Sequence, residues 1–127
     1  LQRMKKYFIH TNGTWELDFF YSPFGIREGE RPYFPLLFLL VDHDSYEIIS
    51  FHLTGHRGYE EEFVEKFLTT IEKMKYLPRA LSVKRKEIYD LFVEASRKLG
   101  IKIYFKDTLD SLEEAQESMF EYFSRKF

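Results

Sequence analysis

The chain of 127 residues contains no cysteine, which excludes a disulfide framework, a thiolate metal site and a cysteine nucleophile. The longest apolar run, Leu36 to Val41, is far too short to span a bilayer. The 19 basic and 21 acidic side chains nearly balance, so no global electrostatic attraction to nucleic acid is expected. No signal-peptide pattern opens the sequence. We therefore expect a soluble protein and favour a cytoplasmic location.

The sequence is rich in aromatic residues. They make up 19% of the chain, as 14 Phe, 9 Tyr and 1 Trp, within a hydrophobic content of 44%. This composition excludes intrinsic disorder, and the length suits one compact domain over residues 1–127. Because the chain begins at Leu1 without an initiator or a signal, we expect it to be part of a longer protein.

The first third of the chain predicts strands. Trp15 to Tyr21 alternates in polarity, which predicts a strand with Asp18 on its less apolar face. The Asn12-Gly13 pair before it favours a hairpin turn, so an extra N-terminal strand is expected at Tyr7 to His10. Ser22 to Pro35 holds three prolines and two glycines, and this predicts a long loop rather than a regular element.

Two further strands follow, and then the hydrophobic period becomes helical. Leu36 to Val41 is apolar on both faces, which is typical of a strand covered by helices on both sides. The strand from Tyr46 to Leu53 returns beside it. The remaining elements are a helix from Tyr59 to Lys75, a strand at Arg79 to Val83, a helix from Ile88 to Leu99 closed by Gly100, a strand at Ile101 to Phe105, and a last helix beginning at Asp110 or Ser111. From Trp15 the order is β-β-β-α-β-α-β-α, which predicts an α/β fold with a mixed five-stranded sheet and helices on both faces.

Three short segments carry a family resemblance along with this order of elements. They are Trp15-Glu16-Leu17-Asp18-Phe19, the hairpin from Leu39 to Ile49 with its Asp-x-x-Ser turn, and Leu77-Pro78-Arg79-Ala80-Leu81. Together they resemble the ribonuclease H-like fold, in particular the catalytic core of retroviral integrases and related transposases, from Trp15 to about Met119. The segment Arg31 to Pro35 is also similar to uncharacterised bacterial domains of this fold.

The resemblance implies a set of carboxylates that hold divalent metal ions for phosphodiester chemistry. Asp18 matches the carboxylate of the first strand, and Glu114 or Glu117 would supply the one on the late helix. The middle carboxylate is absent, because the chain has Ser82-Val83-Lys84 where the family has an acid after the fourth strand. A cation there repels a metal ion, so we expect a non-catalytic descendant without a cofactor.

The residues leave alternatives open at this position. Asp18 could be a structural carboxylate that pairs with Lys84 or Arg85 instead of a metal ligand. In the alternative of a metal-dependent nuclease or transposase, Mg²⁺ or Mn²⁺ would be required, and Asp42 or Asp44 could stand in for the missing ligand.

Lys84-Arg85-Lys86 begins a predicted helix with positive charge, which opposes the helix dipole. These side chains are either solvated or in contact with an anion, such as a phosphate or an acidic partner. The glycine-framed loop Gly55-His56-Arg57-Gly58 is a second candidate for an anion. Nucleic acid binding is therefore a weak alternative. No serine triad, Walker loop or dinucleotide-binding glycine pattern is present.

An aromatic cluster in and beside the predicted loop favours a partner surface. Its principal residues are Phe24, Arg31, Tyr33 and Phe34, of the types that anchor interfaces. The loop could equally fold back and bury them. The last helix carries Phe120, Tyr122, Phe123 and Phe127, beyond a single apolar stripe, and could pack on a second copy. The sequence thus favours an interaction module that contacts protein or nucleic acid, with a homodimeric scaffold as an alternative.

Overall fold

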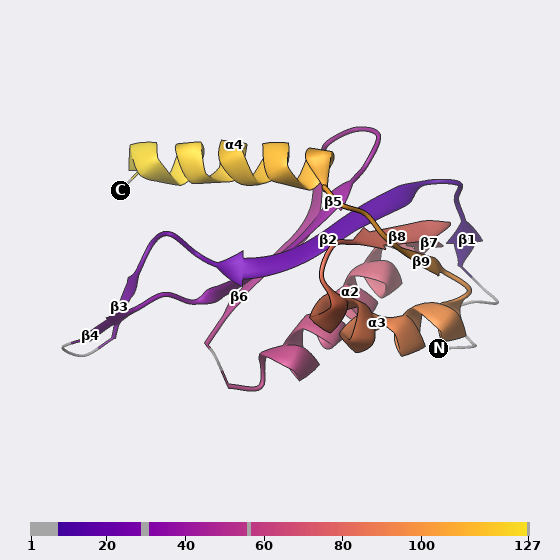
Figure 1. Cartoon of the computed structure of the whole chain (residues 1–127), viewed down its shortest axis with the longest axis horizontal. Coiled ribbons are helices and arrows are strands. Elements are labelled where there is room, and N and C mark those ends of the chain that lie inside the picture. The colour runs from indigo at the N-terminus through magenta and orange to yellow at the C-terminus, as the bar shows by residue number, and fades with distance from the viewer. Residues whose placement is uncertain (1–7, 29–30, 56, 127) are drawn as a thin grey trace.

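The computed structural model describes residues 8–28, 31–55 and 57–126, and its centre is a five-stranded mixed sheet (Figure 1). The strand order is β6-β5-β2-β8-β9. β2, β5 and β6 are antiparallel neighbours, whereas β8 and β9 run parallel to β2. The strands are β2 (Thr14–Tyr21), β5 (Leu36–Asp42), β6 (Ile48–Thr54), β8 (Ala80–Val83) and β9 (Lys102–Phe105). This confirms the predicted ribonuclease H-like order.

Helices cover both faces of the sheet. α2 (Tyr59–Met74) and α3 (Lys86–Leu99) pack on one face, and α4 (Asp110–Lys126) lies across the other (Figure 1). α3 ends at Gly100, whose φ of 75° is the left-handed conformation that glycine adopts at little cost. No helix in the described part of the chain has the length and apolar character needed to cross a membrane.

β5 joins the two cores that these layers form. Leu36, Phe38 and Leu40 belong to the core under α2 and α3, whereas Leu37, Leu39 and Val41 belong to the smaller core under α4. Successive side chains of a strand point to opposite faces, so a strand between two layers must be apolar at every position. The prediction of a doubly covered strand is confirmed.

The predicted N-terminal hairpin is wrong. β1 (Ile9–His10) pairs in parallel with β7 (Tyr76–Leu77), in a separate two-stranded ladder. The carbonyl of Gly13 accepts a hydrogen bond of 2.8 Å from the backbone N–H of Arg79, which directs the chain along the β7–β8 segment instead of back on itself. Tyr7, the predicted start of the strand, lies outside the described residues.

The predicted long loop is in part a β-arm. β3 (Ile26–Glu28) and β4 (Arg31–Tyr33) form an antiparallel pair at its far end (Figure 1). At its base the N–H of Ser22 donates to the carbonyl of Pro35 at 2.8 Å, continuing the β2–β5 pairing. Prolines are tolerated because a two-stranded arm has open edges where a missing N–H costs no ladder bond.

Truncation at Phe38 tests the packing of the larger core. Phe38 is fully buried, so Phe38→Ala should lower the free energy of unfolding by about 3–5 kcal/mol. Phe34→Ala is the matched control, because Phe34 is 54% exposed and its loss should change stability by about 0.5 kcal/mol or less. Urea denaturation followed by circular dichroism measures both, and equal effects would contradict the assigned core.

Candidate functional site

Asp18 is a buried carboxylate near the carboxyl end of β8. β2 pairs with β8 only as far as Glu16 opposite Ser82, so Asp18 lies just beyond the paired segment, where the chain leaves β8 for α3. Asp18 is 4% exposed. A carboxylate with so little access to water requires hydrogen bonds or opposite charge from its neighbours.

Arg85 supplies the nearest positive charge. Its Nη2 and Nε atoms donate to Asp18 Oδ1 at 2.8 and 3.2 Å, and Nη2 also donates to the carbonyl of Phe19. The guanidinium lies over the Phe19 ring, 5.1 Å from its centroid. Arg85 is the N-cap residue of α3, where a serine or aspartate would usually satisfy the first N–H groups. The tertiary pairing with Asp18 explains why a cation stands there.

Lys84 lies between two carboxylates from different elements. Its Nζ atom is 3.8 Å from Asp18 Oδ2 and 3.6 Å from Glu113 Oε1, which belongs to the first turn of α4. The ammonium group therefore occupies the position between the strand carboxylate and the helix carboxylate. In the resemblance described above, that is where a metal ion would be bound.

The helix carboxylate at this site is Glu113. Glu114 instead lines a shallow depression with Tyr46 and Ile48, and Glu117 is exposed further along the helix. Successive helical residues point about 100° apart around the helix axis. Which of the neighbouring glutamates faces Lys84 therefore depends on the rotation of α4 about its own axis as it packs on the sheet. The sequence signal available for Glu113 is its place in the first turn.

Asp42 and Asp44, the two aspartates of the β5–β6 turn, do not point toward Asp18. Asp42 lies opposite Trp15 in the β2–β5 pairing, whereas Asp18 lies opposite Leu39. Asp42 Oδ2 accepts a hydrogen bond of 2.8 Å from the N–H of Ser45, which closes the turn, and Asp44 is exposed. Neither acid is brought to Asp18.

The side chains around Asp18 do not form a suitable ligand set for a divalent metal ion. Among residues 8–28, 31–55 and 57–126, no group of three or more histidine, aspartate and glutamate side chains is placed to hold one. Both oxygens of Asp18 already face cationic groups, and a further positive ion would be repelled by Lys84 and Arg85. The arrangement is an internal ion-pair network in place of a metal centre.

Each residue of the basic segment has an acidic neighbour. Lys86 Nζ is 3.5 Å from Asp90 one turn on, and Arg85 Nη1 donates to Glu87 at 2.8 Å. With Lys84 between Asp18 and Glu113, the segment is compensated within the domain. This offsets the unfavourable placement of positive charge at the start of α3.

Glu16 is a second buried acid on β2, and no sequence pattern pointed to it. It is 2% exposed, and its Oε1 accepts a hydrogen bond of 2.9 Å from the N–H of Leu112. Its Oε2 is 2.6 Å from His43 Nδ1, and Ser111 Oγ donates to the carbonyl of His43 at 2.6 Å. A strand carboxylate thus caps α4 and ties it to the β5–β6 turn, an arrangement formed by residues far apart in the sequence.

The Glu16 carboxylate changes the titration of His43. The hydrogen bond that His43 Nδ1 donates to this carboxylate raises the pKa of His43 above its ordinary value, despite partial desolvation of the ring. A histidine whose folded pKa is raised contributes stability fully below its unfolded pKa. That contribution is lost as pH rises through the folded pKa.

His52 belongs to a different set of contacts. His52 Nε2 is 3.1 Å from Glu62, which also accepts a hydrogen bond from Thr54. These bonds from Thr54 and then His52 lower the pKa of Glu62. His10 is exposed in β1, and His56 lies outside the described residues, so the glycine-framed loop is described only at Gly55, Arg57 and Gly58.

The aromatic residues of the arm divide between the interior and the surface. Phe24 is half-buried, with its ring centroid 6.2 Å from Phe120 and 6.1 Å from Phe123 of α4. Tyr33 and Phe34 are 37% and 54% exposed. The side chain of Arg31 and the residue Phe127 lie outside what the structure describes. The arm thus folds back at its base and presents aromatic rings further out.

The sheet order and the covering helices together define a domain with a ribonuclease H-like fold, in which Asp18 pairs with Lys84 and Arg85. The chain belongs to the family described as Domain of unknown function (DUF6930), whose profile matches residues 1–120. Comparison with curated proteins finds no match.

Solved structures of retroviral integrases share the fold. The HTLV-2 integrase catalytic core domain in complex with magnesium, in its dimeric form, is 18% identical, with a TM-score of 0.65 over 91% of this chain and 71% of that one. The simian T-cell lymphotropic virus intasome in complex with PP2A regulatory subunit B56 gamma is 17% identical, with a TM-score of 0.64 over 92% and 43%. The catalytic core domain of BIV integrase is 11% identical, with a TM-score of 0.55 over 87% and 68%. At these identities the likeness shows the fold alone.

Removing the guanidinium tests the Asp18 network. Arg85→Ala would leave the buried carboxylate with the Phe19 N–H and the ammonium of Lys84, 3.8 Å away, so the free energy of unfolding should fall by about 1–3 kcal/mol, since Arg85 is itself partly exposed. Lys86→Ala, on the next residue, breaks only a surface pair and should cost about 0.5 kcal/mol or less. Chemical denaturation at neutral pH compares them. A loss for Arg85→Ala no greater than for the control would show that Asp18 does not depend on Arg85.

Titration of His43 tests the Glu16 tie. Two-dimensional NMR of the imidazole should give a pKa above 6.5, and Glu16→Gln should bring it back toward 6.5 because the carboxylate is lost. The stability difference between the wild type and His43→Gln should be largest below pH 6.5 and shrink as pH rises. An unshifted His43 in the wild type would contradict the pairing.

Proposed function

We propose that this domain is a non-catalytic ribonuclease H-like interaction module whose partner is a protein or another domain. The observation that carries the proposal is the ammonium group of Lys84, placed between the carboxylates of Asp18 and Glu113. Metal-dependent phosphodiester chemistry needs at least one divalent ion at such a position. Here the protein supplies its own cation there.

The hydrogen bonding of Asp18 supports this assignment. Its Oδ1 accepts from the N–H of Phe19 at 2.9 Å as well as from Arg85, and its Oδ2 faces Lys84. A metal ligand needs at least one oxygen directed toward an open position. Both oxygens of Asp18 are engaged, which is typical of a carboxylate that organises structure.

A protein partner is favoured over nucleic acid by the distribution of charge. Lys84, Arg85 and Lys86, the basic segment that could contact phosphate, are each paired with acidic side chains of the domain. The exposed rings of Tyr33 and Phe34, by contrast, have the residue types that anchor protein interfaces. The HTLV-2 integrase core has a dimeric and a trimeric form, and the simian T-cell lymphotropic virus intasome is in complex with a PP2A regulatory subunit, which is consistent with a fold that engages proteins.

Restoring the missing carboxylate gives the sharpest test. In the wild type, Mn²⁺ should cause no saturable paramagnetic broadening of the amides around Asp18 and Glu113, and no cleavage of single- or double-stranded DNA. Lys84→Asp replaces the internal cation by an acid beside the other two and should bring saturable Mn²⁺ binding. Lys86→Asp is the control, because Lys86 adds the same charge change on the exposed side of α3 and should bring none.

Two safeguards keep this test decisive. Lys84→Ala removes the cation without adding charge, and amide spectra with thermal unfolding establish that each variant retains the fold. Saturable Mn²⁺ broadening at Asp18 and Glu113 in the wild type, together with metal-dependent cleavage, would overturn the proposal in favour of a nuclease or transposase.

Sedimentation equilibrium should give a monomer, whereas a stable dimer would favour the homodimeric scaffold.

A further inference from the structure

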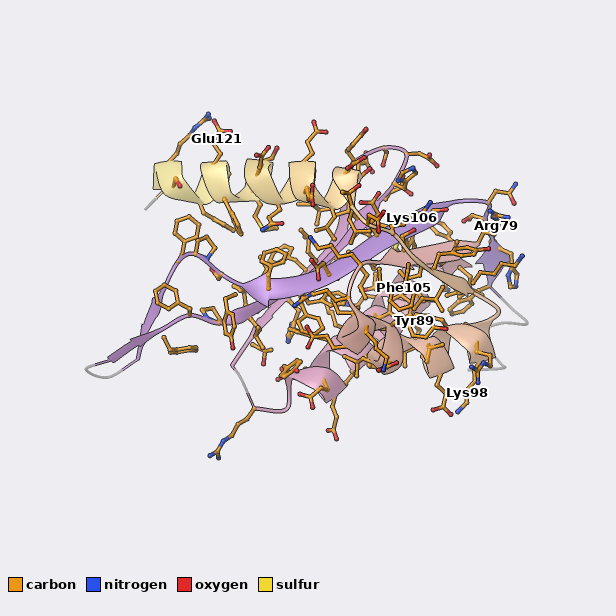
Figure 2. The ribbon with its side chains drawn as sticks, viewed as in Figure 1. Arg79, Tyr89, Lys98, Phe105, Lys106 and Glu121 are labelled. Carbon is orange, nitrogen blue, oxygen red and sulfur yellow. The ribbon has the colours of Figure 1, made fainter. Side chains whose placement is uncertain are left out.

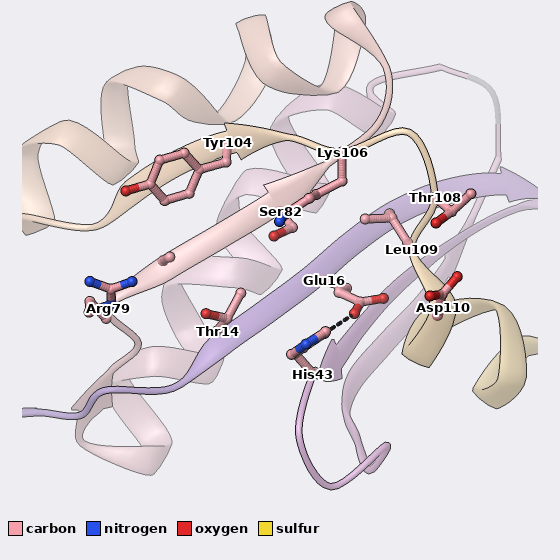
Figure 3. Close-up of a pocket in the computed structure, with 11 residues that line it drawn as sticks. Thr14, Glu16, His43, Arg79, Ser82, Tyr104, Lys106, Thr108, Leu109 and Asp110 are labelled. Carbon is pink, nitrogen blue, oxygen red and sulfur yellow. Dashed lines mark hydrogen bonds and ion pairs between the residues drawn. The ribbon is translucent and has the colours of Figure 1, made fainter.

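A polar pocket of about 370 Å³ lies beside the N-terminus of α4 (Figure 3). α4 packs over β5 and β2 and leaves β8 and β9 uncovered on that face. The pocket floor is a row of side chains at matched positions of three neighbouring strands, namely Glu16, Ser82 and Tyr104. Asp18, Lys84 and Glu113 do not line it, so it is separate from the Asp18 network, although Glu16 and His43 form part of its lining.

Two cations line the pocket without an acidic partner in the described residues. Arg79 and Lys106 are both exposed, and neither takes part in an ion pair there. They come from the start of β8 and from just after β9, and Figure 2 shows both on the β8–β9 side of the molecule. Of the two acids at the pocket, Glu16 is already engaged by Leu112 and His43, which leaves Asp110 at its margin. The pocket therefore favours an anion over a metal ion.

Ser82 is the second, independent indication of a ligand. The residue is 3% exposed, no hydrogen bond joins its hydroxyl to a described residue, and the hydroxyl oxygen is still reached by solvent. This hydroxyl opens into the pocket from the centre of its floor (Figure 3), so a ligand or a water molecule there can supply the hydrogen-bond partner that the protein does not. The hydroxyl groups of Thr14 and Thr108 also line the pocket, so donors surround the space in which an oxyanion would lie.

Tyr104 indicates that the ligand carries a planar aromatic group next to its anionic group. Its side chain is 42% exposed and lies along one wall of the pocket (Figure 3). An open aromatic face beside phosphate-binding groups is suited to stacking of a planar base. The pocket volume lies near the lower end of the range for small-molecule sites, which is enough for one nucleotide but not for a duplex.

We propose that this pocket binds a mononucleotide, with its phosphate held by Arg79, Lys106 and the Ser82 hydroxyl and its base beside Tyr104. The proposal goes beyond the interaction role of the domain and does not depend on the Asp18 network. Binding would lie across β8, β9 and the start of α4, so a bound ligand would stiffen the junction that Glu16 already caps.

Titration of the ¹⁵N-labelled domain with AMP, inorganic phosphate and adenosine tests the proposal. AMP should shift the amides of Ser82, Tyr104 and Lys106 saturably, with inorganic phosphate and adenosine weaker because each supplies only part of the contacts. Arg79→Gln and Lys106→Gln should each raise the Kd for AMP about tenfold, and Ser82→Ala severalfold. Lys98→Gln is the control, since Lys98 lies on α3 away from the pocket (Figure 2) and should leave the Kd unchanged.

Three results would overturn the proposal. They are shifts that do not saturate, a Kd that is the same in Arg79→Gln and Lys106→Gln as in the wild type, and shifts confined to residues outside the pocket. A single-stranded oligonucleotide that binds far more tightly than AMP, with shifts reaching Lys86, would replace it with a nucleic acid interface. Arg79 and Lys106 are exposed, so both variants should keep the wild-type thermal midpoint, which verifies that the fold is intact.

Discussion

The requirement that a buried carboxylate be paired governs this domain. Asp18 has almost no access to water, and the segment after β8 meets that requirement with Lys84 and Arg85. This pairing fixes the start of α3 against β2, and Lys84 extends it to Glu113 of α4. Two helices on opposite faces of the sheet are thereby linked through one side chain of the central strand. The same pairing places positive charge between the carboxylates of Asp18 and Glu113.

Glu16, two residues earlier on β2, is the second buried carboxylate of this strand, and it also links separate elements of the domain. Its carboxylate satisfies the N–H of Leu112 at the start of α4 and holds His43 of the β5–β6 turn. The two acids share the face of β2 that looks toward α4, because residues two apart in a strand point the same way. Between them they set the position of α4 along the sheet. The pocket beside β8 and β9 exists because α4, held there, leaves that part of the sheet open.

Much of the fold could be predicted, and the failures have physical causes. The apolar run of β5, the helical stripes and Gly100 give the order of elements because each depends on local spacing. The turn expected at Asn12-Gly13 fails because hydrogen bonds to a segment some sixty residues later, at Leu77 and Arg79, determine the path of the chain. The arm between Ser22 and Pro35 was predicted as a loop because proline and glycine content does not reveal pairing at open edges.

The sequence by itself determined the strand and helix order, the doubly covered β5 and the absence of an acid at Lys84, since these depend on residue type and period. The tertiary structure alone decided that Glu113, rather than Glu114 or Glu117, faces Lys84, and that Glu16 caps α4. It also decided that Ser82 opens into a polar pocket that Arg79 and Lys106 line as well. The physical reason is that side-chain direction on a helix, and proximity across strands, are set by long-range packing, which local spacing does not encode.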